Sequence, residues 1–418
     1  MLIFNKAKKA MLLLLAGLTI LTACNKELPE AVPIDPPPNG TTPTIATLLD
    51  DPSFSIFKAA VTRAGLMPTL ADPTLRFTVF APDDAAMTAS RITLDVINAL
   101  PAQQVAGLVM YHVIPQLLPS ASIPETFPNL QYPSLLNPAP AVSPFLRLTN
   151  FPSKRGAIAW VNNIPIIAAD LTAVNGVVHK VARVVAPPTK DLWSRIDTSA
   201  SLTYLKAAIT RADSGVAAGG RLQDALNTGV NPSAIASNLT IFAPNDAAMK
   251  VFLTGAITKA LLAQVTPQPP NAVDSATAFG TASFLVATYG TVLLTNPYAI
   301  SPALGATITP TLAKGIVAYH ILSSQSGKFA PPGIRVFSVN IPTAASNVKT
   351  LLNSGVAIHP GLTVQATFGP IGVTAIMVKG AANATASNVL INPLPGGTSD
   401  QHYVNGVIHI IDQVLLPQ

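Results

Sequence analysis

The stretch NGVVHKVARVVAPP, from Asn175 to Pro188, recurs near the other end of this 418-residue chain as NGVIHIIDQVLLP, from Asn405 to Pro417. In both copies, an Asn-Gly pair that supports a tight turn with positive φ precedes a β-branched run with one histidine and a proline stop. Apolar residues alternate onto both faces of each run, which is typical of a strand inside a core. Each copy is therefore expected to close a domain.

Three further motifs recur in the same order. They are KAAVTRA and KAAITRA (58–64, 206–212), FTVFAPDDAAM and LTIFAPNDAAM (77–87, 239–249), and VMYHVI and VAYHIL (109–114, 317–322). A repeat of this kind indicates a domain duplication, with domains at 43–188 and 189–418. The number of residues that separates the two copies of a motif increases from one motif to the next along the chain. The second domain therefore carries insertions, at about 254–309 and before its last strand.

The repeated motifs also predict local elements. Asp51 can cap a helix that begins at Pro52. FTVFAP at 77–82 is typical of a strand ended by its proline, and Asp83 or Asn245 can cap the helix that follows.

Each Tyr-His pair, Tyr111-His112 and Tyr319-His320, lies in an apolar segment of helical spacing. The spacing places each histidine on the apolar stripe of its helix. A lone imidazole there is typical of a neutral core residue that is hydrogen-bonded to a neighbouring element. Metal or proton chemistry is the alternative, although no acid or second histidine lies nearby at ligand spacing. His179 and His409, on the closing strands, are interpreted as structural.

Together these motifs resemble fasciclin-like domains, through the Thr78–Met87 and Thr240–Met249 boxes, the Tyr-His pairs and the closing strands. The resemblance implies an α+β fold of two fasciclin-like domains, each a wedge-shaped, β-sandwich-like sheet core with packed helices. It also implies a role in adhesion, and in animal relatives the Tyr-His region is linked to integrin binding. Met87 and Met249 depart from the family pattern, where an aromatic residue is usual.

The N-terminus has the pattern of a lipoprotein leader. Residues 1–23 combine a basic start with a short apolar run, as in a signal peptide, and end in a sequence that resembles the bacterial lipobox before Cys24. Cys24 is the only cysteine and is the predicted lipidation (palmitate) site. The Pro-rich segment 24–42 is expected to be an extended tether. Its first residues resemble the export tag of Bacteroidetes-like surface lipoproteins, so we expect a lipid-anchored cell-envelope protein in the outer membrane, on either face.

Composition and motifs exclude several functions. Charged residues make up only 11% of the chain, and three lysines of the leader contribute to its net charge of +6. Because no Lys/Arg cluster follows, a nucleic-acid partner is not expected. No nucleophile elbow, zinc motif, Walker loop or dinucleotide fingerprint occurs, so we expect no enzyme activity, cofactor, metal or catalytic residue.

The insertion at 254–309 leaves two interpretations open. It contains the aromatic and β-branched stretch ASFLVATYGTVLLTNPYAI (282–300). This stretch could be an extra hairpin or helix packed on the second domain, or an exposed surface that binds a partner or stacks on sugars. Ser275, within Asp274-Ser275-Ala276, resembles an O-glycosylation signal of Bacteroidetes.

We therefore expect a non-enzymatic cell-envelope lipoprotein that mediates adhesion or extracellular protein or matrix interaction, with an extracellular protein or polysaccharide as partner. The alternative is a glycan-binding accessory module of a surface polysaccharide-uptake system. The second domain is expected to bind, because only it carries the additional loops. The oligomeric state is left open.

Overall fold

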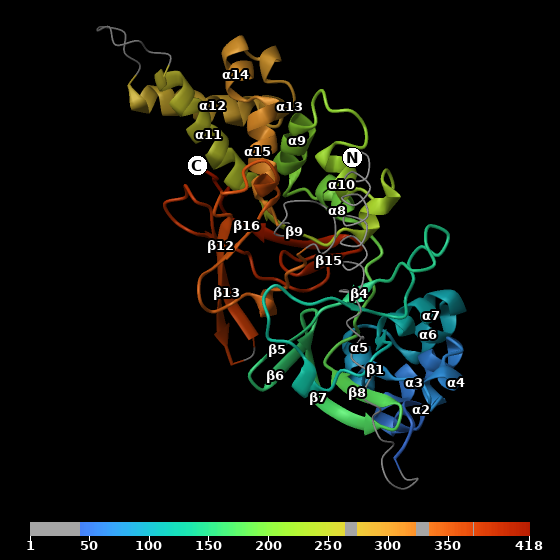
Figure 1. Ribbon diagram of the computed structural model, residues 1–418. Helices are drawn as coiled ribbons and strands as arrows, with labels where there is room; N and C mark the ends of the chain where they lie inside the picture. Colours follow the sequence, from blue (N-terminus) through green and yellow to red (C-terminus); the bar gives the residue numbers. More distant parts are fainter. Residues whose placement is uncertain (1–41, 264–273, 323–333, 371) are drawn as a thin grey trace, which may run out of the picture. The chain divides into compact units, whose positions relative to one another are not determined.

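The computed structural model describes residues 42–263, 274–322, 334–370 and 372–418, and within them the two sequence repeats build matching sheets (Figure 1). The predicted signal peptide, Cys24 and all but the last residue of the predicted tether lie outside the described residues, as does part of the insertion before the last strand. Residues 43–418 form one unit. We refer to 43–188 as the first repeat and to 189–418 as the second repeat.

The first repeat contains a six-stranded sheet in the order β2-β1-β8-β7-β6-β5. Its strands are β1 (Phe77–Pro82), β2 (Val113–Ile114), β5 (Pro152–Arg155), β6 (Ile158–Val161), β7 (Ile164–Ala173) and β8 (Gly176–Val181). A short pair, β3 (Tyr132–Pro133) and β4 (Thr149–Asn150), lies outside it. The closing strand β8 runs parallel to β1 and antiparallel to β7, so it is an interior strand, as its two apolar faces predict.

The second repeat has a four-stranded sheet with the same centre, in the order β10-β9-β16-β15. Its strands are β9 (Leu239–Pro244), β10 (Ile321–Leu322), β15 (Gln401–Tyr403) and β16 (Gly406–Ile411), and β16 runs parallel to β9. A separate sheet contains β11 (Ser346–Val348), β12 (Leu362–Gly369), β13 (Gly372–Lys379) and β14 (Ser387–Asn388). This mixture of helices and sheets confirms the predicted α+β class.

Helices cover one face of each central sheet. In the first repeat they are α2 (Ile45–Leu48), α3 (Ser55–Arg63), α4 (Met67–Ala71), α5 (Asp84–Ala89), α6 (Leu94–Ala99) and α7 (Ala102–Tyr111). Phe57 of α3 and Val109 of α7 share a core with Val79 and Val178 of the sheet. The predicted caps form, since the Asp83 side chain accepts the Ala86 N–H, 2.7 Å away, at the start of α5.

The second repeat keeps this helical layer and extends it. The matching helices are α8 (Leu192–Thr198), α9 (Thr203–Ala212), α10 (Leu222–Leu226) and α15 (Pro310–Tyr319). In the part that the structure describes, the insertion is helical: it lengthens α11 (Asp246–Ala263) and adds α12 (Ser275–Tyr289), α13 (Val292–Thr295) and α14 (Pro302–Thr307). Figure 1 shows these four helices grouped beside α15, on the side away from β12 and β13.

The Asn-Gly pairs do more than form turns. A tight turn precedes the glycine in both copies, at 174–175 and 404–405, but only Gly176 has a positive φ (+151°), so the predicted positive φ is wrong for Gly406. Both glycines instead allow the parallel strands to approach, because a Cβ would lie 2.0 Å from the Phe77 carbonyl oxygen in one repeat and 2.5 Å from that of Leu239 in the other. Glycine is the residue that permits such an approach.

The asparagines before these glycines are buried and hold the start of each repeat. The Asn175 side chain accepts the Ile45 N–H (2.8 Å) and donates to the Leu70 carbonyl oxygen (2.8 Å). Asn405 likewise accepts from Leu192 N (2.9 Å) and donates to Leu226 O (3.0 Å). Each Asn-Gly pair therefore joins the last strand of its repeat to the first helices.

Candidate functional site

The histidine of each Tyr-His pair is buried and follows the last residue of its helix. His112 caps the C-terminus of α7, one residue beyond the helical stripe on which it was expected. Its Nδ1 donates to the Leu108 carbonyl oxygen (2.8 Å), and its Nε2 accepts the Val185 N–H (2.9 Å). The imidazole thus joins α7 to the segment after the closing strand.

His320 repeats this arrangement in the second repeat. Its Nδ1 donates to the Ile316 carbonyl oxygen (2.8 Å), and its Nε2 accepts the Leu415 N–H (2.9 Å). Burial lowers the pKa of both His112 and His320 to about 4. Each ring is therefore neutral near pH 7 and has no free nitrogen for a metal ion or a proton transfer.

The tyrosines of the two pairs are buried as completely as the histidines. The Tyr111 hydroxyl donates to the Thr149 carbonyl oxygen (3.0 Å). The Tyr319 hydroxyl donates to the Gly361 carbonyl oxygen (2.6 Å) and accepts the Ala381 N–H (2.9 Å). In this conformation neither Tyr-His pair presents a side chain to a partner.

The histidines of the closing strands belong to a second repeated arrangement. The Nε2 of His179 donates to the Leu118 carbonyl oxygen (2.9 Å), and its Nδ1 accepts the Asp170 N–H (3.2 Å). The equivalent contacts of His409 are to Val336 O (2.9 Å) and Asp400 N (3.3 Å). Each histidine thus fixes the backbone of an aspartate on the neighbouring strand or just before it.

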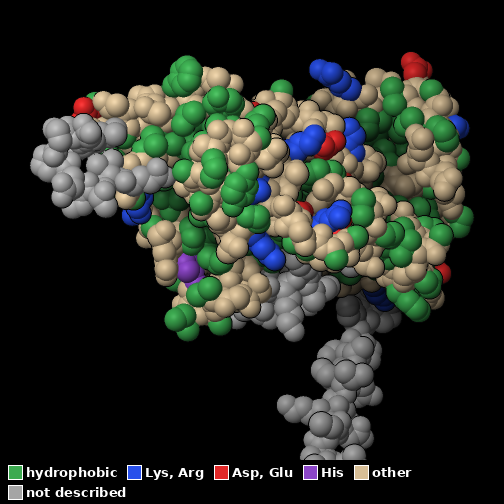
Figure 2. Space-filling model, turned by 90° about the horizontal axis from the view of Figure 1, so that it is seen from above, with side chains coloured by type: hydrophobic (Ala, Val, Ile, Leu, Met, Phe, Trp, Pro, Cys, Tyr) green, Lys and Arg blue, Asp and Glu red, His purple; other side chains and the backbone are tan. Residues whose placement is uncertain are grey.

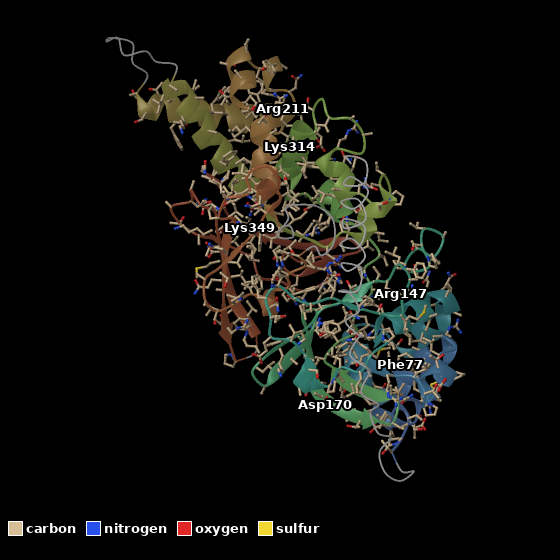
Figure 3. All side chains as sticks on the ribbon, in the orientation of Figure 1. Phe77, Arg147, Asp170, Arg211, Lys314 and Lys349 are labelled. Carbon is tan, nitrogen blue, oxygen red and sulfur yellow. The ribbon has the colours of Figure 1, made fainter. Side chains whose placement is uncertain are left out.

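Both aspartates adopt a left-handed conformation and hold a serine. Asp170 has a φ of +61° and Asp400 a φ of +53°, which is uncommon for residues other than glycine. The Asp170 carboxylate accepts the main-chain N–H (2.8 Å) and the hydroxyl of Ser120, and Asp400 binds Ser338 in the same way (2.6 and 2.7 Å). Figure 3 labels Asp170 on the sheet of the first repeat.

This arrangement of Ser, Asp and His is structural. In a hydrolase triad the histidine Nε2 takes a proton from the serine, whereas here it donates to a main-chain carbonyl oxygen, as seen for His179 and Leu118. Sequence reasoning missed the two aspartates. The signal was present, because an aspartate precedes the closing-strand histidine by the same interval in both copies.

A buried arginine, also missed in the sequence, lies where the two repeats meet. Arg335 is 2% exposed, and its Nη1 donates to the Nε2 of His402 (2.7 Å). Further donations reach main-chain carbonyl oxygens, including that of Val404 (3.1 Å). The guanidinium carbon lies 5.2 Å from the ring centroid of Phe151, a residue of the first repeat. Burial lowers the pKa of Arg335 to about 10, which leaves it charged.

The helices of the insertion carry large apolar side chains on their surface. Val251 of α11 is 73% exposed, Phe279 and Phe284 of α12 are 57% and 65% exposed, and Tyr298 after α13 is 59% exposed. We call these four residues the insertion surface. Figure 2 shows one face of the molecule on which hydrophobic side chains lie among uncharged polar ones, with only scattered charges. Large exposed apolar side chains are typical of interaction sites where they gather in one patch.

Ser275, the predicted glycosylation site, is exposed as the first residue of α12. The preceding Asp274 caps that helix by accepting the Thr277 N–H (2.7 Å). The Ser275 hydroxyl is therefore accessible, at the end of α12 nearest to α11.

The described residues contain neither a metal site nor a membrane-spanning helix. No group of three or more His, Cys, Asp or Glu side chains in the described ranges is placed to hold a metal ion. Among the helices that the structure describes, none combines the length and the apolar character needed to cross a bilayer.

Comparison with known proteins identifies relatives of the chain. The family model of the fasciclin domain matches residues 52–187. The transforming growth factor-beta-induced protein ig-h3 of pig (Sus scrofa) is 32% identical over 162 residues, which are 37% of this chain and 21% of the pig protein. This chain thus spans about a fifth of the length of that relative.

A bacterial relative is covered more completely. Protein sll1483 of Synechocystis sp. is 31% identical over 148 residues, which are 32% of this chain and 68% of that protein. Among solved structures, a FAS1 domain pair from the insect cell adhesion molecule Fasciclin I aligns with 87% of this chain and 96% of its own length, at 15% identity and a TM-score of 0.32. The family-model match and the extent to which the Synechocystis protein is covered show that this chain belongs to the fasciclin-domain family.

Proposed function

We propose that the chain is a non-enzymatic cell-envelope lipoprotein that mediates adhesion or extracellular protein or matrix interaction, and that the insertion surface of the second repeat carries the binding. Fasciclin domains are linked to cell adhesion and extracellular interaction, and proteins that contain them are often extracellular or surface-associated. Membership of this family supports the general class. The exposure of the insertion surface is the observation that supports the location of binding.

The contrast between framework and insertion favours this location. The motifs that the two repeats share are buried, including both Tyr-His pairs. The shared motifs are therefore explained by packing, since both repeats need the same buried side chains to fold. The insertion occurs in the second repeat alone, and there Phe279 and Phe284 point away from any core.

Tyr298 is held in a defined orientation. A Cβ on Gly305 of α14 would lie 2.2 Å from the Tyr298 ring, so the ring packs directly on that glycine. The guanidinium carbon of Arg211, which Figure 3 labels on α9, lies 5.8 Å from the ring centroid. An aromatic side chain that is fixed before binding loses less entropy when a partner docks.

The exposed aromatic rings also favour the second candidate, a glycan-binding accessory module of a polysaccharide-uptake system. Rings such as those of Phe284 and Tyr298 offer flat apolar faces, on which the C–H faces of sugars can stack. In this case the same surface would bind an oligosaccharide in place of a protein.

The binding test uses the double variant Phe279→Ser/Phe284→Ser in the mature chain. Because both rings are exposed, the fold should be preserved while binding to matrix proteins or to a glycan array falls at least about 10-fold, as for loss of an aromatic anchor. The matched control is Phe145→Ser, which removes an 87% exposed ring from the first repeat. Binding to a defined oligosaccharide would support the glycan module, and binding to protein alone would support adhesion. Unchanged binding by the double variant, or an equal loss with Phe145→Ser, would contradict the assigned surface.

The lipid anchor has a separate test. Replacement of Cys24 by Ala should move the protein from the membrane fraction to the soluble fraction, because each buried acyl methylene contributes about 0.8 kcal/mol to membrane binding. Protease treatment of intact cells would then show whether the anchored protein faces outward from the outer membrane. Membrane association that survives Cys24→Ala would contradict the anchor.

A further inference from the structure

We propose that the two repeats are held together by a proton-sensitive latch, in which Arg335 and His402 of the second repeat close on Tyr111 and Phe151 of the first. Protonation of His402 would open the latch and loosen the contact between the repeats before either core unfolds. The proposal concerns the junction of the repeats and does not depend on the binding function of the insertion surface.

Aromatic contacts define the latch. The His402 ring centroid lies 6.4 Å from that of Tyr111 and 6.5 Å from that of Phe151, in the other repeat. Phe337 packs on both sides of the junction, with ring centroids 5.2 Å from His402 and 5.8 Å from Phe151. The part-buried imidazole therefore contacts residues of both repeats.

The hydrogen bond between Arg335 and His402 requires a neutral imidazole. A guanidinium group has only donors and stays charged at all relevant pH values. The 2.7 Å contact from Arg335 Nη1 to His402 Nε2 therefore needs a lone pair on that nitrogen. A proton on Nε2 would abolish the bond and place two positive charges in contact at a part-buried site.

No negative charge faces His402 in the described part of the chain. The first repeat contributes the Tyr111 hydroxyl, whose pKa is raised by burial and which stays uncharged. On the His402 side, the nearby Asp400 carboxylate is engaged with Ser338. Burial, followed by the charge of Arg335, lowers the pKa of His402 well below its ordinary value. Among the described residues around His402, none therefore offers a free negative charge to compensate the added proton.

The latch is not part of the framework that the repeats share. Leu118 and Val336 occupy equivalent positions, because their N–H groups bind the equivalent Thr78 and Thr240 hydroxyls. The equivalent of Arg335 in the first repeat is therefore Leu117. By strand register, the equivalent of His402 is Thr172. The first repeat builds the same framework without this pair, so the contacts of Arg335 with Phe151 and of His402 with Tyr111 are specific to the junction.

The test measures exposure of a thiol buried at the junction. Ser153 is 2% exposed and lies on β5 between Phe151 and Arg155, whose Nη2 donates to the Ile341 carbonyl oxygen of the second repeat (2.9 Å). In the full chain with Cys24→Ser, the variant Ser153→Cys would carry a unique thiol. Its rate of reaction with dithiodipyridine, divided by the rate for an unfolded cysteine peptide at the same pH, gives the opening equilibrium.

The expected result is a rise of at least about tenfold in the opening equilibrium between pH 7.5 and 4.5. A histidine freed on opening regains a pKa of about 6.5, whereas burial and Arg335 hold the pKa of His402 well below that value in the closed state. The control Ala60→Cys places the thiol in the core of the first repeat, where only unfolding exposes it. Acid also favours unfolding, through His112 and His320, but the opening equilibrium at Ala60→Cys should stay well below that at Ser153→Cys at every pH, because the repeats separate before either core unfolds.

A second variant, His402→Gln in the Ser153→Cys background, keeps an acceptor for Arg335 but cannot be protonated. It should flatten the pH dependence at Ser153→Cys to less than about threefold. Equal opening equilibria for Ser153→Cys and Ala60→Cys, or an unchanged pH dependence in His402→Gln, would overturn the latch. If His402→Gln did not fold, the comparison of the two thiol positions would decide alone.

Discussion

An imidazole that uses both ring nitrogens on main-chain groups becomes part of the framework. His112 and His320 have this role, since each joins the end of a helix to the segment after the closing strand. Replacing His112 by Ala leaves a carbonyl oxygen and an N–H without partners, together with a small cavity. The free energy of unfolding should fall by about 1–3 kcal/mol, as measured by urea denaturation.

His320→Ala is the matched variant, because its side chain makes the same two bonds in the second repeat. A similar loss is expected there, and binding of the folded protein should be unchanged in both variants. If either variant kept full stability but lost adhesion, the Tyr-His pair would be a contact surface and not a core feature.

The same two histidines predict how stability depends on pH. Their pKa values are lowered to about 4 in the folded chain, whereas an unfolded histidine has a pKa of about 6.5. The unfolded state therefore binds protons first as the pH falls. The stabilisation is complete above pH 6.5 and is lost towards pH 4, by up to about 3 kcal/mol for each residue. Thermal denaturation between pH 7.5 and 4 should show this loss, and a flat profile would contradict the burial of neutral rings.

Sequence reasoning predicted the burial of these histidines because helical spacing is a local property. It did not find Asp170, Asp400, Arg335 or His402, because their partners lie far away in the chain. The Arg335 guanidinium, for example, binds His402 and faces Phe151. Only the folded chain brings these three residues together.

At the scale of elements, each repeat is defined by its closing strand, which pairs in parallel with the strand of the Phe-Ala-Pro motif. These pairs are β8 with β1 and β16 with β9. The register is equivalent in both, with Gly176 opposite Phe77 and Gly406 opposite Leu239. Gly176→Ala should prevent this approach, since its Cβ would lie 2.0 Å from the Phe77 carbonyl oxygen and its φ is +151°. The expected loss of stability is more than about 2 kcal/mol.

Gly315→Ala is the control for this substitution. Gly315 lies within α15, and an added Cβ would meet nothing within 4 Å. This change should stabilise the helix by about 0.5–1 kcal/mol. Chemical denaturation of both variants would check the contrast, and a tolerated Gly176→Ala would show that the strands can separate without cost.

The sequence predicted the elements of the framework better than those of the insertion. The FAP strands, their capped helices and the interior closing strands follow from alternation and capping residues, which act locally. The insertion, in contrast, lengthens α11 and adds α12. Both helices are apolar around much of their surface, as Val251 and Phe284 show. When the sequence of a helix has no distinct polar face, it does not indicate which face of the helix packs against the rest of the protein.

At the scale of the whole chain, the two repeats share buried surface. Phe151 and Trp160 of the first repeat form one cluster with Phe337, Val339 and Val407 of the second. Hydrogen bonds also cross the junction, such as that from the Asn340 side chain to the Thr126 carbonyl oxygen (3.1 Å). The two repeats are therefore expected to stabilise each other.

Division of the chain between residues 188 and 189 tests this mutual stabilisation. Phe151, Trp160 and Phe337 are each no more than 4% exposed in the whole chain. Separation would transfer them to water at a cost of about 1.5–3 kcal/mol for each side chain. Residues 43–188 and 189–418, expressed alone, should melt several degrees below the whole chain and bind a hydrophobic dye, whereas residues 43–418 should unfold in one transition at neutral pH. Calorimetry of the three proteins measures the melting temperature of each. If both halves melted at the same temperature as the whole chain, the junction would add nothing to stability, and the repeats would be independent modules.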